Sequence, residues 1–201
     1  MVGDSITCGY GDLGMLPCTF SADTEDENAA WGALAARQVD AGHVAVAYSG
    51  KGMYRNYGGD MSATMPQIWN RVFADDGTSS YGFSQYQPDV VVVNLGTNDY
   101  STGDPGMPFE TAYTGFLGQV RLQYPNAFIV CATGPMTDDS SYQSHVQAAI
   151  AAAADPKVSY LDLGVQDCNV DGCGCDYHPS QVTQQKMADK LVAHLKTLLP
   201  W

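Results

Sequence analysis

Short apolar runs recur along the chain and alternate with longer stretches of helical periodicity. The clearest run, within residues 88–95, contains four consecutive valines. Similar runs cover residues 44–48, 127–132 and, more weakly, 158–163. These runs are apolar on both faces, which is typical of strands in a parallel sheet that helices cover on both sides. The pattern therefore predicts strands over these residues.

Helical periodicity separates the apolar runs and covers residues 28–39, 109–124, 140–154 and 181–199. The third of these stretches ends in an alanine run before an Asp-Pro pair, and a residue that precedes proline disfavours helical backbone. The sequence shows no internal repeat, linker or second domain. The strand–helix alternation predicts one three-layer α/β domain over residues 1–201.

Long, glycine-rich segments join these elements at residues 8–25, 49–62, 75–87 and 164–179. All but residues 75–87 follow a predicted strand. In an open α/β sheet, ligands bind beyond the carboxyl ends of the strands. We therefore expect a functional site to be built from these loops.

The net charge of the chain indicates which classes of binding partner are unfavourable. The 201 residues include 22 acidic and 9 basic side chains, for a formal net charge of −13. Such a field repels phosphate backbones and anionic membrane surfaces, and no apolar run approaches the ~20 residues that span a bilayer. We expect neither nucleic acid nor a membrane as a partner. A neutral substrate fits better, although a soluble secreted protein could carry the same charge without such a role.

The six cysteines are many for a cytosolic enzyme of this size. Cys168, Cys173 and Cys175 are spaced C-x₄-C-x-C, which is not the spacing of zinc-ligand pairs, and we predict no metal. Disulfides between loops fit better and imply an oxidising compartment, hence a secreted protein. Their connectivity does not follow from the sequence. The leading pair is Cys8–Cys18, because a short clamp there would hold the neighbouring loop.

The start of the chain is abrupt. Met1-Val2 runs directly into a Gly-Asp-Ser sequence and leaves little room for a first strand. No signal peptide is recognisable. We expect that further residues precede this segment.

Three short motifs fall where strands are predicted to end. Ser5 can present its hydroxyl to a reacting carbonyl, although an isolated serine more often caps a helix. Gly50 and Gly52 free backbone N–H groups to bind an oxyanion, and Asn98 offers a side-chain amide for the same purpose. Each of these glycine- and asparagine-containing motifs is also a common turn composition.

The candidate general base is His178, since imidazole titrates near neutral pH. It lies in a loop just before the last helix, whereas His43 opens a strand and His145 lies mid-helix. His194 falls on the apolar stripe of the last helix. Only His178 has a position suited to catalysis, although a histidine in a loop is more often a surface residue.

These residues, taken in chain order, carry a family resemblance. Ser5, Gly52 or Gly50, Asn98 and His178 resemble the four blocks that supply Ser, Gly, Asn and His in SGNH (GDSL-type) hydrolases. The resemblance covers nearly the whole chain. It implies a flavodoxin-like fold, an α/β/α sandwich around a mainly parallel five-stranded sheet. It also implies ester cleavage through an acyl-serine intermediate, with no cofactor.

A narrower resemblance is to the catalytic domain of carbohydrate esterase family 2. It rests on the sequences GDSITCGYG, SGKGMYRNY, GTND and GCDYHP. It implies a secreted, monomeric enzyme that removes acetyl groups from xylan or mannan, so that its partner is an acetylated polysaccharide or oligosaccharide. Members of this family carry a β-sandwich domain before the hydrolase domain. Nothing here corresponds to one, so the resemblance implies a segment excised or trimmed at its N-terminus.

One position departs from the wider class, which has its acid three residues before the histidine. Cys175 occupies that position here, and Asp176 is two residues before His178. Asp176 is therefore an uncertain third member of a triad. A backbone carbonyl near Cys175 could orient the imidazole instead, and we favour this Ser-His dyad.

Aromatic side chains are the candidate sugar platforms. The candidates are Tyr54, Tyr100 and Tyr177, of which Tyr100 and Tyr177 directly adjoin proposed catalytic residues. We expect Trp31 and Trp69 to pack in the core. Sugar sites combine such rings with nearby polar groups.

Two other functions remain open. A general short-chain acyl esterase or lipase is one, although a lipase should show an exposed apolar lid that this sequence lacks. A non-catalytic carbohydrate-binding module on the same fold is the other. It would have no need of both Ser5 and His178, which are present.

Overall fold

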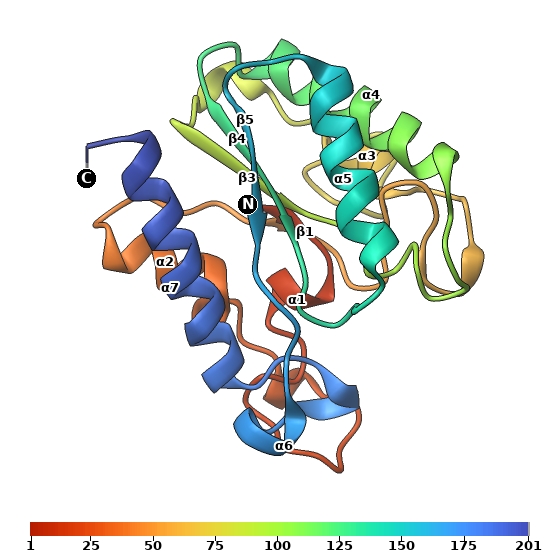
Figure 1. Ribbon diagram of the computed structural model, residues 1–201, viewed down its shortest axis with the longest axis vertical. Helices are drawn as coiled ribbons and strands as arrows, with labels where there is room; N and C mark the ends of the chain where they lie inside the picture. The colour runs from red at the N-terminus through yellow and green to blue at the C-terminus, as the bar shows by residue number, and fades with distance from the viewer. Residues whose placement is uncertain (201) are drawn as a thin grey trace.

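A central sheet of five strands organises the computed structural model, which describes residues 1–200 (Figure 1). The strands are β1 (Val2–Gly3), β2 (Val46–Ala47), β3 (Val90–Asn94), β4 (Phe128–Thr133) and β5 (Val158–Asp162). They lie in the order β2-β1-β3-β4-β5, and each neighbouring pair is parallel. The predicted α/β fold with a five-stranded sheet is confirmed, and the sheet is wholly parallel.

Four longer helices cover this sheet. They are α2 (Trp31–Gln38), α4 (Met107–Gln123), α5 (Ser140–Ala153) and α7 (Gln181–Leu198). Three shorter helices, α1 (Ser5–Cys8), α3 (Met65–Ile68) and α6 (Cys168–Asp171), lie in the connections. Figure 1 shows α4 and α5 together on one side of the sheet and α2 and α7 together on the other. Each predicted helix is present, and the largest shift is at α2, which starts later because residues 27–29 form a separate 3-10 turn.

The valines of β3 explain why the sheet is covered on both faces. Successive side chains of a strand point to opposite faces. Val91 and Val93 belong to the core beneath α4 and α5, whereas Val92 belongs to the core beneath α2 and α7. A strand that is apolar on both faces therefore suits only a sheet between two helical layers.

Buried side chains also fix the helices that position the site. Trp31 is fully buried and Trp69 is 5% exposed, which confirms that both pack in the core. Gln184 on α7 is also fully buried. Its Oε1 accepts from the backbone N–H of Trp31 at 3.0 Å, and its Nε2 donates to the backbone carbonyl of Ile6 at 3.2 Å. These bonds join the start of α7 to α2 and to α1, so the segment just before α7 is held relative to α1.

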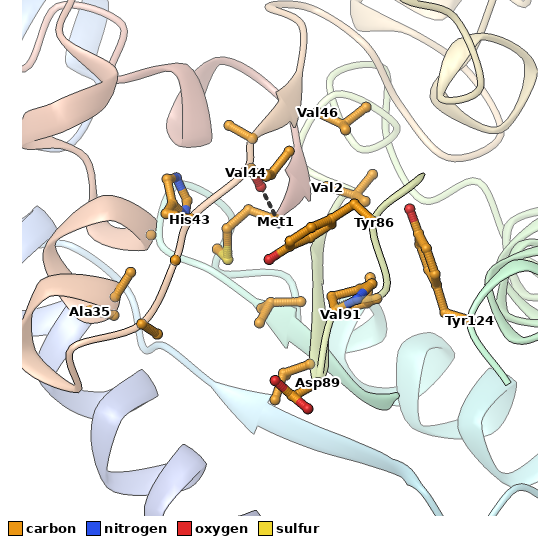
Figure 2. A pocket seen from close by; sticks show the side chains of 18 of the residues that line it. Met1, Val2, Ala35, His43, Val44, Val46, Tyr86, Asp89, Val91 and Tyr124 are labelled. Carbon is orange, nitrogen blue, oxygen red and sulfur yellow. Dashed lines mark hydrogen bonds between the residues drawn. The ribbon is translucent and has the colours of Figure 1, made fainter. Parts of the chain in front are cut away.

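A cavity of about 580 Å³ lies at the amino ends of β1, β2 and β3 (Figure 2). Its walls are mostly valine, alanine and tyrosine side chains, among them Val91, Tyr86 and Tyr124. The Met1 amino group donates to the Val44 carbonyl at 2.7 Å, as the dashed line in Figure 2 shows.

Candidate active site

Ser5 lies where β1 turns into α1, at the carboxyl end of the first strand. Asp4 caps this helix, since its Oδ1 accepts from the Ile6 N–H at 3.0 Å. Gly3 allows a close approach, because a Cβ there would lie 2.1 Å from Thr7 Oγ1. Gly3 and Asp4 thus serve the local turn. Asp4, rather than Ser5, is the cap, which leaves the Ser5 hydroxyl free for other contacts.

His178 meets that hydroxyl from the far end of the chain. Its Nε2 lies 2.8 Å from Ser5 Oγ, and its Nδ1 lies 3.3 Å from the Cys175 carbonyl oxygen. A carbonyl only accepts, so Nδ1 carries the proton of the neutral ring and Nε2 is left to accept from the serine. This is the arrangement that a general base needs before it takes a proton from a hydroxyl.

The surroundings of His178 keep the imidazole neutral. Burial lowers its pKa, and this effect exceeds the opposing effects of the hydrogen bonds at Cys175 and Asp176 and of the Asp176 charge. A neutral imidazole is the form that accepts a proton, so burial favours the base over a wider range of pH.

The Asp176 carboxylate turns away from the imidazole Nδ1. Its Oδ2 accepts from the Tyr10 hydroxyl at 2.6 Å and from the Phe20 N–H at 3.0 Å. Both Asp176 and Tyr177 have a positive φ, of 50° and 62°. This local left-handed backbone aims the carboxylate at the loop after α1. The geometry is that of a Ser-His pair oriented by a backbone carbonyl.

Asn98 approaches the nucleophile from the loop after β3. It is 6% exposed, and its Nδ2 donates to Asp4 Oδ2 at 3.0 Å and to the Lys51 carbonyl at 2.9 Å. Burial raises the pKa of Asp4 to about 7. Asn98 therefore lies beside the helix cap that presents Ser5, with both of its N–H groups already engaged in the resting structure.

The two candidate glycines differ in their surroundings. Gly50 lines the same cavity as Ser5 and His178, has a φ of 79°, and its N–H finds no acceptor in the part of the chain that the structure describes. The Gly52 N–H donates to Asn56 Oδ1 at 3.1 Å. A Cβ at Gly52 would lie 1.9 Å from the Arg55 carbonyl, so this glycine serves packing. The structure thus brings Gly50 to the site and leaves Gly52 outside it.

Asp99 holds the Gly50 loop and was not among the predicted site residues. Its carboxylate accepts from the N–H groups of Met53, Tyr54 and Arg55 at 2.7 to 2.8 Å. Burial raises its pKa to about 6. Its place next to Asn98 in the Gly-Thr-Asn-Asp sequence is the only signal that could have indicated this role.

Ser5, Gly50, Asn98 and His178 line a cavity of about 760 Å³ at the carboxyl ends of the strands. Tyr100 lies in its wall, whereas Tyr54 packs against the hydrophobic core and Tyr177 is 65% exposed beside it. Tyr57 also lines the cavity and was missed, since nothing in the sequence distinguishes it among 12 tyrosines. Polar and acidic side chains complete the wall: Tyr10, Ser49, Thr97, Ser101, Thr137, Asp138, Asp139 and Asp176.

The other histidines are engaged elsewhere. His43 contacts Glu27, His145 contacts Glu110 and Asp104, and His194 contacts Ser159. None of the three lines the cavity that holds Ser5.

The disulfides correct the predicted pairing. The structure pairs Cys18 with Cys175 and Cys168 with Cys173, and Cys8 and Cys131 are free. The predicted Cys8–Cys18 bond is wrong because the loop after α1 pairs with the loop before His178.

Backbone bonds bring those two loops together. The Cys175 N–H donates to the Gly11 carbonyl, and the Asp176 N–H donates to the Cys18 carbonyl. Contacts between segments so distant in sequence are not visible in cysteine spacing.

Comparison with known proteins agrees with this arrangement. Residues 1–186 match the GDSL-like Lipase/Acylhydrolase family. The chain belongs to this family.

The similar proteins are esterases by name. The chain is 36% identical over its full length to cellulase/esterase CelE of Acetivibrio thermocellus, of which it covers 25%. It is 26% identical to an acetylxylan esterase / glucomannan deacetylase of Cellvibrio japonicus, of which it covers 57%. The chain thus spans a quarter to rather more than half the length of these curated relatives.

Solved structures with a similar fold include carbohydrate esterases. A family two carbohydrate esterase from Clostridium thermocellum, in complex with cellohexaose, superposes with a TM-score of 0.92 at 36% identity. All of this chain and 63% of that chain are covered. The resemblance to carbohydrate esterase family 2 is therefore confirmed. No helix in residues 1–200 is long and apolar enough to cross a membrane.

Proposed function

We propose that this chain is the catalytic domain of a secreted serine esterase that removes acetyl groups from xylan or mannan. The observation that carries the proposal is the 2.8 Å contact between Ser5 Oγ and His178 Nε2, within a cavity that Gly50 and Asn98 also line. A nucleophile, a base and oxyanion donors that converge on one cavity are the parts that acyl transfer requires.

In the first half of the reaction, His178 Nε2 takes the Ser5 proton while Oγ forms a bond to the acetyl carbonyl carbon. The carbonyl electron pair moves onto its oxygen. The donors for this oxyanion are the N–H groups of Ser5 and Gly50 together with the Asn98 amide. When the oxyanion collapses, the bond to the sugar oxygen breaks, and His178 returns the proton to that oxygen. The acetyl group is left on Ser5.

In the second half, water replaces the sugar hydroxyl. His178 takes a proton from water as the water oxygen attacks the acetyl-serine carbonyl. The same donors hold the second oxyanion. Collapse breaks the bond to Ser5 Oγ, which regains its proton, and acetate leaves. Protons and electrons balance with Ser5 and His178 alone, so no cofactor is required.

Asn98 has a distinct part in this scheme. Both of its N–H groups have acceptors in the resting site, Asp4 Oδ2 and the Lys51 carbonyl. To serve the oxyanion, it must redirect or share one of these bonds. The interaction is then stronger in the transition state than in the ground state, which is the condition for an effect on kcat.

Two properties support a neutral polysaccharide ester as substrate and an extracellular setting. No lysine or arginine lines the cavity within residues 1–200, and Asp138, Asp139 and Asp176 do. The acidic wall disfavours anionic substrates. The two disulfides are consistent with an oxidising compartment. The relatives named as acetylxylan esterase / glucomannan deacetylase point to the same substrate class.

A panel of esters tests the proposal. Acetate release would be measured from acetylated xylan and acetylated glucomannan, and compared with the hydrolysis of p-nitrophenyl acetate, butyrate and octanoate. We expect activity on the acetylated polysaccharides and on the acetate ester, with a sharp fall for longer acyl chains. The Ser5→Ala variant is the background control. Preference for octanoate over acetate would favour a lipase-like enzyme, and the absence of any Ser5-dependent hydrolysis would contradict an esterase.

A further inference from the structure

The ring of Tyr10 lies flat against the His178 imidazole. The ring centroids are 4.0 Å apart and the planes differ by 26°. Tyr10 lies two residues after the end of α1, and its backbone N–H donates to the Ser5 carbonyl at 3.1 Å. One residue therefore touches the backbone of the proposed nucleophile and the ring of the proposed base.

The Tyr10 hydroxyl is held as firmly as its ring. It donates to Asp176 Oδ2 at 2.6 Å, the same oxygen that accepts from the Phe20 N–H at 3.0 Å. Burial and the bond to Asp176 raise the pKa of the Tyr10 phenol to about 12, so it remains a donor at neutral pH. Asp176 thus fixes the outer end of the ring that covers His178.

The direct restraint on the imidazole is weak by comparison. The contact from Nδ1 to the Cys175 carbonyl is 3.3 Å, which is long for a hydrogen bond between nitrogen and oxygen. The shorter contact, from Nε2 to Ser5 Oγ at 2.8 Å, is the one that changes when the proton is transferred, so the long Nδ1 contact is a weak hold on the ring during the reaction. A flat aromatic surface on one face restricts the rotation of the ring.

We propose that Asp176 acts on His178 through Tyr10, so that Tyr10 is a positioning residue of the Ser-His pair. This inference rests on the proposed function of the site. The stacked ring keeps Nε2 aimed at Ser5 Oγ. Once the imidazole has taken the serine proton, the face of the same ring stabilises the imidazolium by a cation–π interaction. In the wider class the acid contacts the histidine directly. Here Tyr10 lies between Asp176 and His178 and contacts both.

A double-mutant cycle tests this chain of contacts. The variants are Tyr10→Phe, which keeps the ring but loses the bond to Asp176, Asp176→Asn, and the two combined. If Asp176 acts through Tyr10, each single change lowers kcat by about threefold to tenfold. The kcat of the double variant is then no lower than that of the less active single variant. Losses that multiply would show that Asp176 acts on His178 directly, and would overturn the proposal.

Removal of the ring gives the larger effect. Tyr10→Leu should lower kcat by about tenfold to a hundredfold, because proton transfer depends on the placement of the base. The substrate is p-nitrophenyl acetate, which lacks a sugar, so KM should stay within about twofold. Tyr86→Leu, at the opposite end of the sheet, is the matched control. A Tyr10→Leu variant with the kcat of the unmodified protein would contradict the proposal.

A second readout does not depend on esterase activity. The ¹⁵N chemical shifts of the His178 ring report which nitrogen is protonated and whether the ring is held in one state. In the unmodified protein and in Tyr10→Phe we expect the Nδ1–H tautomer, and in Tyr10→Leu an exchange-averaged ring. Unchanged shifts in Tyr10→Leu would reject the positioning role even if the chain proved to have no esterase activity. Near-ultraviolet circular dichroism establishes that each variant is folded.

Discussion

Both ends of the sheet hold a cavity, but only the cavity at the carboxyl ends contains a serine and a histidine in contact with each other. The cavity at the carboxyl ends, of about 760 Å³, contains Ser5, Asn98 and His178. The cavity at the amino ends, of about 580 Å³, is walled mainly by valine, alanine and tyrosine. Volume alone does not distinguish them. The cavities differ in that Ser5, Asn98 and His178 converge in one of them. These residues lie in the segments that follow the carboxyl ends of the strands or precede the last helix.

The geometry of a parallel sheet explains this difference. All five strands end at the same edge, so the loops that follow β1, β2, β3 and the last strand converge there. Ser5 starts a helix at that edge, and its N–H is one of the groups that a helix start leaves unpaired.

The largest expected effect is at the nucleophile. Ser5→Ala should lower kcat by on the order of 10⁶, because the acyl-enzyme route is lost. Only one hydroxyl is removed, so the thermal midpoint should hardly change. Steady-state kinetics with p-nitrophenyl acetate and thermal unfolding would be measured together. Retention of more than a few per cent of activity would exclude Ser5 as the nucleophile.

The oxyanion donor comes next. Asn98→Ala should lower kcat by about 10²–10³ with little change in KM, because the donor acts mainly in the transition state. The comparison is with the unmodified protein on the same acetate ester. A raised KM with an unchanged kcat would make Asn98 a substrate-binding residue instead.

Disulfides brace the carboxyl end only, within the described residues. Cys18–Cys175 joins residues 157 apart in sequence, and Cys168–Cys173 joins residues 5 apart. By the loop-closure argument, replacing both members of the first pair with serine should cost about 2–5 kcal/mol of unfolding free energy, and replacing the second pair less. Urea unfolding of both double variants checks the order. The reverse order would mean that native contacts, rather than chain entropy, dominate.

The pH dependence of kcat/KM should reflect the buried imidazole. Burial lowers the pKa of His178, and catalysis needs its neutral form. The neutral fraction therefore persists as the pH falls, and the acid limb of the profile should have its midpoint below the ordinary histidine value of about 6.5. A midpoint above pH 7 would indicate a carboxylate that acts directly on His178, as in a triad.

The smallest effect is expected at the amino end. Tyr86 lines that cavity and is 41% exposed. Tyr86→Leu should leave kcat and KM within about twofold and change stability by about 1 kcal/mol or less. A loss of activity comparable to that of Asn98→Ala would show that the two ends are coupled.

Much of the site followed from residue types at strand ends. Ser5 and His178 were predicted because a nucleophile and a loop histidine fell beyond predicted strands, and the structure places them in contact. The structure also gives the reason for the departure at Cys175: its carbonyl oxygen lies where it can hold the imidazole Nδ1. Asp176 has other partners, as the register of the sequence suggested.

Other features required the folded chain. Gly50 and Gly52 are equivalent as glycines in one loop. In the structure, the Gly52 N–H bonds to Asn56, whereas Gly50 lines the cavity of Ser5. Tyr10 has no signal in the sequence, because its stacking on His178 joins residues far apart in the chain. Cys18 pairs with Cys175 and not with Cys8 as predicted, and this bond also joins residues far apart in the chain.

The amino-acid sequence by itself determined the layered α/β architecture, since apolar periodicity acts over a few residues and reports which face each element must bury. It also determined the chemical groups available at the strand ends. Only the tertiary structure decided which glycine N–H remained free, which cysteines paired and which ring covers the histidine. The cysteine pairing and the Tyr10 stack depend on how loops separated by more than a hundred residues pack together, and no local pattern encodes that packing. The glycine outcome depends on how one loop folds back so that Asn56 accepts from Gly52.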